Sequence, residues 1–431
     1  MHILYLCQLV PYPPDAGPKV RAYYTLRYLA QRHEVTLVAF TRPDDQAEAL
    51  ERLRTFCAQV YTAPIRRSAW RNSRDLLSSL AAGDSFIIRR DFAAEMASKV
   101  DRLLEGGDFD AVHADQLWMA QYALRAKRRP AADSKLQTIL DEHNACFQIF
   151  QRLAQGEGNP LKRALLEREW RRLGDFEARA LGQFDRVVTV TDEDRKTLQG
   201  LLERSITAGK LVPSIQSPIS EDQPPHFSTI PICVDTEEIQ PVRPKTGARD
   251  VLHLGTMFWQ PNVEGVVWFA REVWPKVRAA VPGATFTIAG KNPPGEVREL
   301  QAMSGPRSAN SAREPDLRVT GYVADPQPYL EEAGVFIVPL FSGSGMRVKI
   351  VDAWRWGLPV VSTRIGAEGI RYIDGENILI AEDAEGFAEA VRRVLTDGEL
   401  AQRLRSNGRR WVEEHYDWRK VYSAWDEIYG R

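Results

Sequence analysis

The chain has 431 residues, of which 44% are hydrophobic and 27% are charged, a composition typical of globular proteins. This length exceeds one ordinary hydrophobic core, so we expect two or three domains. Lysine and arginine number 57 and aspartate and glutamate 58, so the sequence lacks the basic excess of nucleic-acid-binding proteins. We therefore expect no nucleic-acid partner.

Four widely spaced cysteines form no paired motif: Cys7, Cys57, Cys146 and Cys233. Their spacing argues against a disulfide framework or a metal cluster and favours a cytoplasmic location. The first ten residues have neither a basic leader nor a cleavage site and read as a buried strand. No apolar run reaches eighteen residues, which argues against a membrane-spanning helix.

The first half alternates short apolar runs with helical patterns, which predicts parallel strands joined by crossover helices. We expect strands at 2–10, 34–40, 59–64, 111–113, 137–141 and 186–190. We expect helices at 20–32, 44–57, 161–181 and 192–202, the last with Thr191 as its N-cap. The helix at 161–181 has apolar residues at helical spacing, which predict a buried face: Leu161, Leu165, Leu166, Trp170, Leu173 and Phe176. Residues 203–230 show no periodicity and are expected to form a surface insertion.

A linker at 234–244 precedes a second alternating half. We expect strands at 251–255, 285–289, 318–321, 335–340, 359–363 and 377–381. We expect helices at 263–279, 326–333, 346–356, 384–396, 399–416 and 418–429. Two α/β halves of similar size predict a ligand cleft between them, and further sites at the carboxyl ends of parallel strands.

The segment after the strand at 335–340 carries the strongest functional pattern. A turn of small residues, 342–345, precedes a helix, so backbone N–H groups and the positive end of a helix dipole are available to an anion. Arg347 and Lys349 add two cations, which the dipole alone would disfavour by about a few tenths of a kcal/mol. Asp352, one turn on, can accept hydrogen bonds from sugar hydroxyls. A diphosphate next to a ribose satisfies all these groups; the alternative is a tight turn with solvated cations.

This segment resembles the nucleotide-sugar site of glycosyltransferase family 4. Asp352-Ala-Trp-Arg-Trp-Gly-Leu-Pro-Val-Val is similar to the family's E-A-M-x-x-G-x-P-V-V, with aspartate for glutamate. The preceding Gly343-Ser-Gly-Met-Arg-Val-Lys is similar to a branch that reads G-G-G-x-R-x-K-x-x-E, and Ser344 takes the place of the usual first glutamate. The resemblance implies an α/β fold of the GT-B class, with two Rossmann-like domains facing each other across a cleft.

The resemblance also implies the domain order and the donor site. Residues 1–232 would form the acceptor-side domain, 233–415 the nucleotide-sugar domain, and 416–431 a helix that crosses back to the first domain. The donor-binding residues it implies are Gly17, Gly255, Tyr322, Val323, Ser344, Gly345, Met346 and Asp352.

The expected catalytic residues are Arg347, Lys349, Asp115 and His143. Asp115 replaces the second histidine of the family's H-x-H and would meet the transferred sugar; the alternative is an aspartate that caps the following helix. His143, in an H-N pair after a strand, would bind the acceptor, and the alternative is a structural histidine. Lys19 and Arg21 are expected beside phosphates or an acidic acceptor, unless they belong to a proline-stiffened surface turn.

The resulting hypothesis is a hexosyltransferase-type enzyme that moves a sugar from a nucleotide-diphosphate sugar to a glycan, lipid-linked or small-molecule acceptor. By resemblance, the reaction retains anomeric configuration and uses no cofactor and no metal, in agreement with the absence of a supported D-x-D motif. Alternatives are an epimerase or hydrolase of the same fold and a catalytically silent binding subunit. A NAD-dependent oxidoreductase is disfavoured because no G-x-G-x-x-G follows the first strand.

Residues 65–77 mix basic residues with tryptophan and leucine, as segments at membrane surfaces do. This pattern suggests peripheral association with the inner face of the cell membrane, as expected for enzymes of polysaccharide biosynthesis that extend lipid-linked oligosaccharides. A solvated surface is the alternative.

Overall fold

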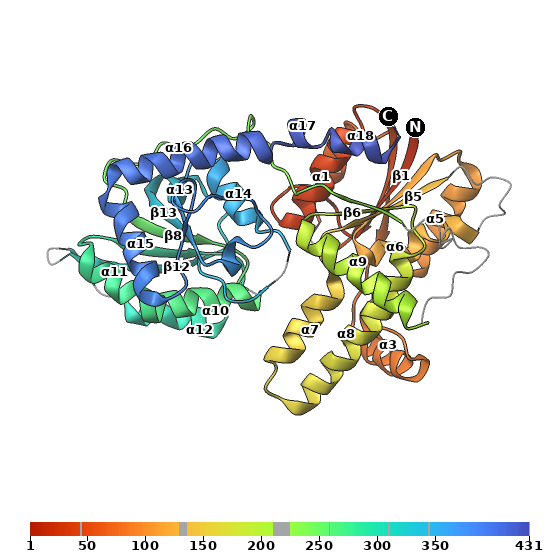
Figure 1. Ribbon diagram of the computed structural model, residues 1–431, viewed down its shortest axis with the longest axis horizontal. Coiled ribbons are helices and arrows are strands. Elements are labelled where there is room, and N and C mark those ends of the chain that lie inside the picture. The colour runs from red at the N-terminus through yellow and green to blue at the C-terminus, as the bar shows by residue number, and fades with distance from the viewer. Residues whose placement is uncertain are drawn as a thin grey trace. The chain divides into compact units, whose positions relative to one another are not determined.

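The computed structural model describes residues 1–43, 45–128, 136–209, 225–257, 259–304, 306–308, 311–343 and 345–430. The chain divides into two compact units, Met1–Cys233 with Val421–Arg431, and Val234–Lys420 (Figure 1). Each unit is built on a parallel sheet with helices, which confirms the predicted α/β class.

The first unit has a seven-stranded parallel sheet in the order β3-β2-β1-β4-β5-β6-β7. Its strands are β1 (His2–Cys7), β2 (Glu34–Thr41), β3 (Gln59–Pro64), β4 (Ala111–Asp115), β5 (Gln137–Glu142), β6 (Arg186–Thr189) and β7 (His226–Thr229). The central strands are continuous apolar runs because helices cover both faces of such a sheet. The strand order reverses between β1 and β4, the position where open α/β sheets place ligands.

The helices of this unit include several that the sequence analysis did not anticipate between 69 and 156. They are α1 (Gly17–Leu29), α2 (Ala47–Arg54), α3 (Ala69–Ala82), α4 (Phe86–Arg90), α5 (Ala94–Gly106), α6 (Leu117–Ala123), α7 (Cys146–Gly156), α8 (Pro160–Leu181), α9 (Asp192–Thr207) and α18 (Ala424–Ile428). Thr191 caps α9 as predicted, since its hydroxyl accepts a hydrogen bond of 2.9 Å from the Asp194 N–H.

Two expectations for this unit are wrong. The proposed insertion at 203–230 contains the end of α9 and strand β7, which pairs in parallel with β6; residues 210–224 lie outside the described part. The proposed buried face of α8 holds for its second half, where Leu173 is fully buried. Leu161 and Leu165 are 77% and 49% exposed, because α7 and α8 form an antiparallel pair whose joined end no other element covers (Figure 1).

The second unit has a six-stranded parallel sheet in the order β12-β9-β8-β13-β14-β15. Its strands are β8 (Asp250–Leu254), β9 (Thr285–Ala289), β12 (Leu317–Gly321), β13 (Ala333–Val338), β14 (Val360–Ser362) and β15 (Leu379–Ile380). A separate antiparallel pair, β10 (Pro306–Ser308) and β11 (Ser311–Pro315), lies outside this sheet. Here the strand order reverses between β8 and β13.

The main helices of the second unit are α10 (Gln260–Trp268), α11 (Trp274–Ala280), α12 (Gly295–Glu299), α13 (Gln327–Glu332), α14 (Val348–Arg355), α15 (Ala384–Thr396) and α16 (Gly398–His415). The helix expected at 263–279 is interrupted by a π-helical turn, Phe269–Val273, just before Pro275, which has no N–H to donate. The helix expected at 418–429 is likewise divided into α17 (Trp418–Val421) and α18.

The position of α14, which carries Lys349, is fixed by close packing against α16. Trp354 of α14 is fully buried, and its indole N–H donates to the Asn377 carbonyl at 2.9 Å. A Cβ atom added at Gly408 of α16 would lie 2.5 Å from Trp354 Cδ1. Only glycine at position 408 lets the two helices approach this closely.

We therefore expect Gly408→Ala to destabilise the second unit by about 1–3 kcal/mol, the usual cost of overpacking a core. Urea denaturation followed by tryptophan fluorescence measures this loss. The matched control is Gly398→Ala, in the first turn of the same helix, where an added Cβ meets no atom within 4 Å. A loss at position 408 no larger than at 398 would contradict this account of the packing.

Candidate active site

The glycine-rich turn of the second unit follows β13, beside the point where the strand order reverses. Gly343 has φ 126° and Gly345 φ 75°, backbone conformations that other residues rarely adopt. A Cβ at Gly343 would also lie 2.8 Å from Arg347 Nη2. Both glycines are thus needed for the turn itself; Ser344 lies outside the described residues.

Arg347 folds back over this turn and is 4% exposed. Its Nη1 donates to the Gly345 carbonyl at 3.0 Å, and its Nη2 lies 3.4 Å from a carboxylate oxygen of Glu368. The guanidinium also lies 5.7 Å from the ring centre of Trp259. The cation is therefore held at the turn and does not extend into solvent.

Lys349 lies in the first turn of α14, and its ammonium group points at the loop after β8. Nζ donates to Asn262 Oδ1 at 2.6 Å and lies 3.0 Å from where a Cβ on Gly255 would be. No carboxylate among the described residues forms an ion pair with it. Burial, together with the positive charge of Arg347, lowers the pKa of Lys349 to about 7.

His253, at the end of β8, faces the same point and is fully buried. Its Nδ1–H donates to the Ile337 carbonyl at 3.1 Å, while Nε2 has no hydrogen-bond partner within the described part of the chain. Burial, and then the charge of Lys349, hold the pKa of His253 well below its ordinary value, so the ring is neutral. Nε2 lies 3.3 Å from the position of a Cβ on Gly255.

Sequence reasoning therefore found Gly255 and Lys349 but missed His253 and Asn262, which complete the cluster. The available signal was their closeness to Gly255 in sequence, His253 at the end of β8 and Asn262 in the first turn of α10. Nothing in a lone histidine and a lone asparagine indicates that they meet a lysine from another helix.

The segments that follow β8 and β9 also converge with the end of β12 in the second unit. The Gly255 N–H donates to the Ala289 carbonyl at 3.0 Å and the Gly290 N–H to the Gly321 carbonyl at 2.8 Å. A Cβ at Gly290 would lie 1.7 Å from the Gly255 carbonyl oxygen, so any side chain at position 290 would collide with the backbone of Gly255. Tyr322 follows and is 68% exposed.

The remaining predicted donor residues have different surroundings. Val323 is partly exposed, whereas Met346 is 8% exposed and packs under the turn. Asp352 forms an ion pair with Arg355 at 2.9 Å, and burial raises the pKa of Asp352 despite that partner. Gly17 begins α1 in the first unit and is partly exposed.

In the first unit, Asp115 and His143 meet at the carboxyl ends of β4 and β5. Asp115 Oδ1 lies 3.1 Å from His143 Nε2 and also accepts from the Tyr5 hydroxyl at 3.2 Å. The Cys7 thiol donates to its other oxygen at 3.2 Å. Asp115 is fully buried and does not cap α6, whose N-cap residue makes no side-chain cap bond, so the capping alternative is wrong.

Beside this pair lies a fully buried ion pair, Arg21 with Asp141. Arg21 donates from Nε and Nη2 to the two carboxylate oxygens at 2.9 and 3.0 Å. Its guanidinium lies 4.8 Å from the ring centre of Trp425. The expectation that Arg21 meets phosphates is wrong, because it belongs to the face of α1 that packs on the sheet. Lys19 forms an ion pair with Asp15 at 3.1 Å.

Two groups in this unit bring potential metal ligands within 4.8 Å of one another: Asp115, Asp141 and His143, and Glu142, Cys146 and Glu177. Both groups are accounted for without a metal. In the first, Arg21 already supplies the positive charge. In the second, Glu177 accepts hydrogen bonds from two N–H groups that open α7, at 2.8 and 2.9 Å. Burial raises the pKa of Glu177 to about 8 and that of Glu142 well above its ordinary value, so neutral acids fit.

Two family models match the chain. The one described as Glycosyltransferase Family 4 matches residues 16–207, in the first unit, and the one described as Glycosyl transferases group 1 matches residues 248–397, in the second. A relative from Klebsiella pneumoniae, described as an uncharacterized 44.6 kDa protein in the cps region, is 30% identical over 175 residues. That match covers 41% of this chain and 44% of the relative, so the chain spans less than half of that protein.

Solved structures match the chain over its whole length. Anabaena Alr3699/HepE, crystallised with UDP and glucose, is 13% identical with a TM-score of 0.60, over 100% of this chain and 99% of that one. WaaG, a glycosyltransferase involved in lipopolysaccharide biosynthesis, is 17% identical with a TM-score of 0.63, over 99% and 100%. At these identities the likeness establishes the two-domain GT-B fold.

The buried ion pair predicts a strong stability effect. Asp141→Asn leaves Arg21 buried without its counter-charge, so we expect a loss of about 3–5 kcal/mol at neutral pH, measured by chemical denaturation. Arg21 outweighs the effect of burial and holds the pKa of Asp141 below its ordinary value. The stabilisation is therefore present above the unfolded pKa of about 3.9 and is lost as the pH falls through the lower folded value. The difference between wild type and variant should shrink in strong acid.

The control for this variant is Asp101→Asn. Asp101 forms an ion pair with Arg125, and both side chains are partly exposed to solvent. An exposed pair contributes about 0–1 kcal/mol, so this control should change little. Equal losses at positions 141 and 101 would contradict the role given to the buried pair.

Proposed function

We propose that this chain, which belongs to the GT-B glycosyltransferases, transfers a hexose from a nucleotide-diphosphate sugar to a glycan, lipid-linked or small-molecule acceptor. One observation carries the proposal: Arg347 and Lys349 both lie at the glycine-rich turn, close enough for the charge of Arg347 to lower the pKa of Lys349. A diphosphate beside them would supply negative charge to both. The structural neighbour that holds UDP and glucose supports a donor of this class.

On the donor side, Lys349, Arg347 and the N–H groups of the turn at Gly345 and Met346 would bind the diphosphate. Asp352 would accept hydrogen bonds from the ribose, and the backbone at Tyr322 and Val323 would meet the base. Glycine at position 255 lets the backbone approach Lys349 closely, since an added Cβ would lie 3.0 Å from its Nζ.

The bond-breaking step then depends on how well the negative charge of the leaving group is stabilised. When the bond between the sugar and the diphosphate breaks, the leaving group is an anion, and preorganised cations lower the barrier most at this step. We propose that Arg347 and Lys349 do this without a metal or cofactor. We further propose that the anomeric configuration is retained, with a donor phosphate oxygen accepting the proton of the acceptor hydroxyl.

On the acceptor side, His143 would contact the sugar or the acceptor, and Asp115 would position it. Asp115 has no exposed surface and acts through its hydrogen bond to His143, whereas His143 is 4% exposed. His143 Nδ1 is buried and has no hydrogen-bond partner among the described residues. Gly17 would allow α1 to approach the donor.

A cytoplasmic enzyme at the inner face of the cell membrane is part of the proposal. None of the helices that the structure describes is long and apolar enough to cross a membrane. Peripheral contact is supported by Trp70 and Leu77 of α3, which are 74% and 67% exposed within the segment 65–77.

The donor proposal predicts the outcome of a binding screen. Nucleoside diphosphates and their sugars are added at about a hundredfold their Kd, which should raise the free energy of unfolding by about 2.7 kcal/mol and shift the thermal transition upward. Arg347→Ala/Lys349→Ala should abolish the shift. Lys276→Ala is the control, since this lysine is exposed on α11 of the same unit.

Turnover separates the reaction classes. Sugar transfer to acceptor that persists in EDTA and is lost in Arg347→Ala supports the transferase. Equal consumption of donor with and without acceptor would favour a hydrolase or epimerase, and binding without turnover a silent subunit.

The low pKa of Lys349 makes donor binding proton-linked. A free lysine with pKa about 7 is mostly neutral at pH 8, and a neighbouring anion restores its charge, so binding at that pH should take up close to one proton (about 0.9). Affinity should fall as the pH rises above 7. Titration calorimetry of UDP in buffers with different ionisation enthalpies measures the uptake, which Lys349→Met should remove. A binding enthalpy independent of the buffer would contradict this linkage.

A further inference from the structure

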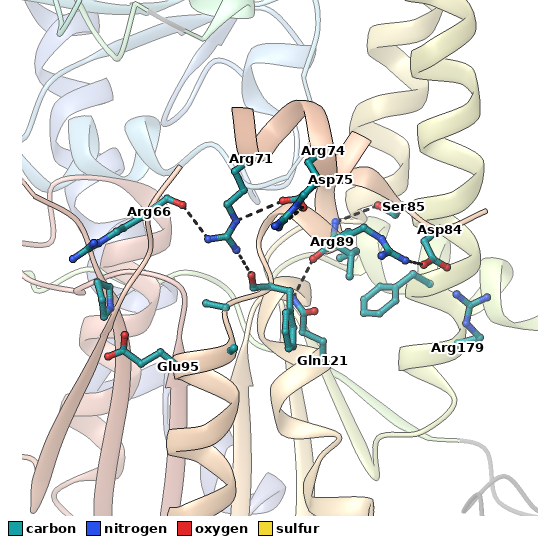
Figure 2. A pocket seen from close by; sticks show the side chains of 16 residues that line it. Arg66, Arg71, Arg74, Asp75, Asp84, Ser85, Arg89, Glu95, Gln121 and Arg179 are labelled. Carbon is teal, nitrogen blue, oxygen red and sulfur yellow. Dashed lines mark hydrogen bonds and ion pairs between the residues drawn. The ribbon is translucent and has the colours of Figure 1, made fainter. Parts of the chain in front are cut away.

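The first unit contains a pocket of about 930 Å³, away from the residues assigned above. Figure 2 shows its walls, which come from α3, α4, α6, α8 and the segment 92–95. Its volume lies in the range of sites that bind small molecules. All the residues that line it belong to one unit, so the pocket is complete within that unit.

Positive charge predominates in this pocket. The arginines that line it are Arg66, Arg71, Arg74, Arg89 and Arg179. The acids that line it are Asp75, Asp84 and Glu95. Two of the acids are paired with arginines of the wall, and the third lies 4.0 Å from Lys99 on its own helix. The lining therefore carries more guanidinium groups than carboxylates.

Some of these arginines build the wall. Arg71 Nη1 donates to the Arg66 carbonyl at 3.3 Å, and its Nη2 donates to the Phe92 carbonyl, as the dashed lines in Figure 2 show. Arg71 thus joins three segments of the chain. Arg74 binds Asp75 at 3.0 Å and Arg89 binds Asp84. These contacts fix the shape of the pocket before any ligand arrives.

Unlike Arg71, Arg74 and Arg89, the side chains of Arg66 and Arg179 do not hold the wall of the pocket together. Both side chains are exposed, and within the described residues neither guanidinium has a hydrogen bond or ion pair. In Figure 2 they lie on opposite sides of the pocket. Two guanidinium groups without structural partners fit a ligand with more than one anionic oxygen, because each can bind two such oxygens at once.

Most of the uncharged lining is apolar, and the pocket adjoins an exposed apolar stripe. Phe92, Phe176 and Ile88 contribute to the lining. On α3, the Arg74 guanidinium lies 5.6 Å from the ring centre of Trp70, which begins a stripe on the outer face of the helix. The members of the stripe are Trp70, Leu77 and Leu80, which are 74%, 67% and 43% exposed. One helix thus presents both cations and apolar surface.

We propose that this pocket binds the phosphate or diphosphate headgroup of an amphiphile, whose apolar chain lies along Trp70, Leu77 and Leu80. The amphiphile is the acceptor, or the carrier of the acceptor, in the reaction proposed above, and in this respect the inference rests on that function. A purely apolar ligand would leave the guanidinium groups unsatisfied, and a small inorganic anion would leave the stripe exposed.

The test uses three probes on the full-length chain: farnesyl diphosphate, inorganic pyrophosphate and farnesol, with affinities measured by titration calorimetry. We expect farnesyl diphosphate to bind more tightly than either of the others. Arg66→Ala/Arg179→Ala should weaken its binding about ten- to a hundredfold without loss of fold, since neither side chain holds the structure. Arg171→Ala is the matched control, an arginine of α8 that is 61% exposed and does not line the pocket.

UDP affinity, measured on the same variants, separates this inference from the donor site. The pocket variant should bind UDP like the wild type, and Arg347→Ala/Lys349→Ala should lose UDP but retain farnesyl diphosphate. Unchanged farnesyl diphosphate affinity in the pocket variant would overturn the inference, whatever UDP does. Equal affinity for pyrophosphate and farnesyl diphosphate would support an anion site but contradict the binding of an apolar chain. Binding of farnesol as tight as that of farnesyl diphosphate would contradict the anion site.

Discussion

The second unit brings two cations, Arg347 and Lys349, to one glycine-rich turn. Gly343 and Gly345 give that turn a backbone conformation that other residues rarely adopt, and Glu368 and Asn262 lie beside the two cations. Burial and the charge of Arg347 lower the pKa of Lys349 to about 7, and burial and the charge of Lys349 hold the pKa of His253 well below its ordinary value. The diphosphate proposed above would restore the charge on Lys349 that burial disfavours.

In the first unit the imbalance of buried charge has the opposite sign. At the ends of its central strands the carboxylates outnumber the cations, and Arg21 is buried among them with Trp425 stacked against it. This arrangement keeps Asp141 ionised and leaves Asp115 to hold the imidazole of His143. Nearby, burial instead raises the pKa values of Glu142 and Glu177, and Glu177 accepts hydrogen bonds from two N–H groups at the start of α7. The two neighbouring clusters therefore carry different charge in the same buried region.

Sequence reasoning predicted the positions of most sheet strands along the chain, because continuous apolar runs are required wherever both faces of a sheet are covered. It also identified the turn at Gly343 and Gly345, where the backbone conformation restricts the choice of residue. It could not find Asn262 or His253, since their role depends on a contact with α14, which is far from them in sequence. It misjudged Leu161 and Leu165 because helical periodicity shows that a helix has an apolar face but not that another element covers it. Arg21 was misplaced for a related reason, since a charged residue in a first helical turn gives no sign that it is buried.

The first unit is not continuous in sequence. Tyr422, Trp425 and Tyr429, which pack around Arg21 and His113, are made only after the entire second unit has been synthesised. During translation these aromatic side chains are therefore absent from the first unit until the segment 234–420 has been made. The aromatic segment can cover the buried ion pair of Arg21 only after the second unit has been synthesised, so the burial of this charged cluster is a late step of folding.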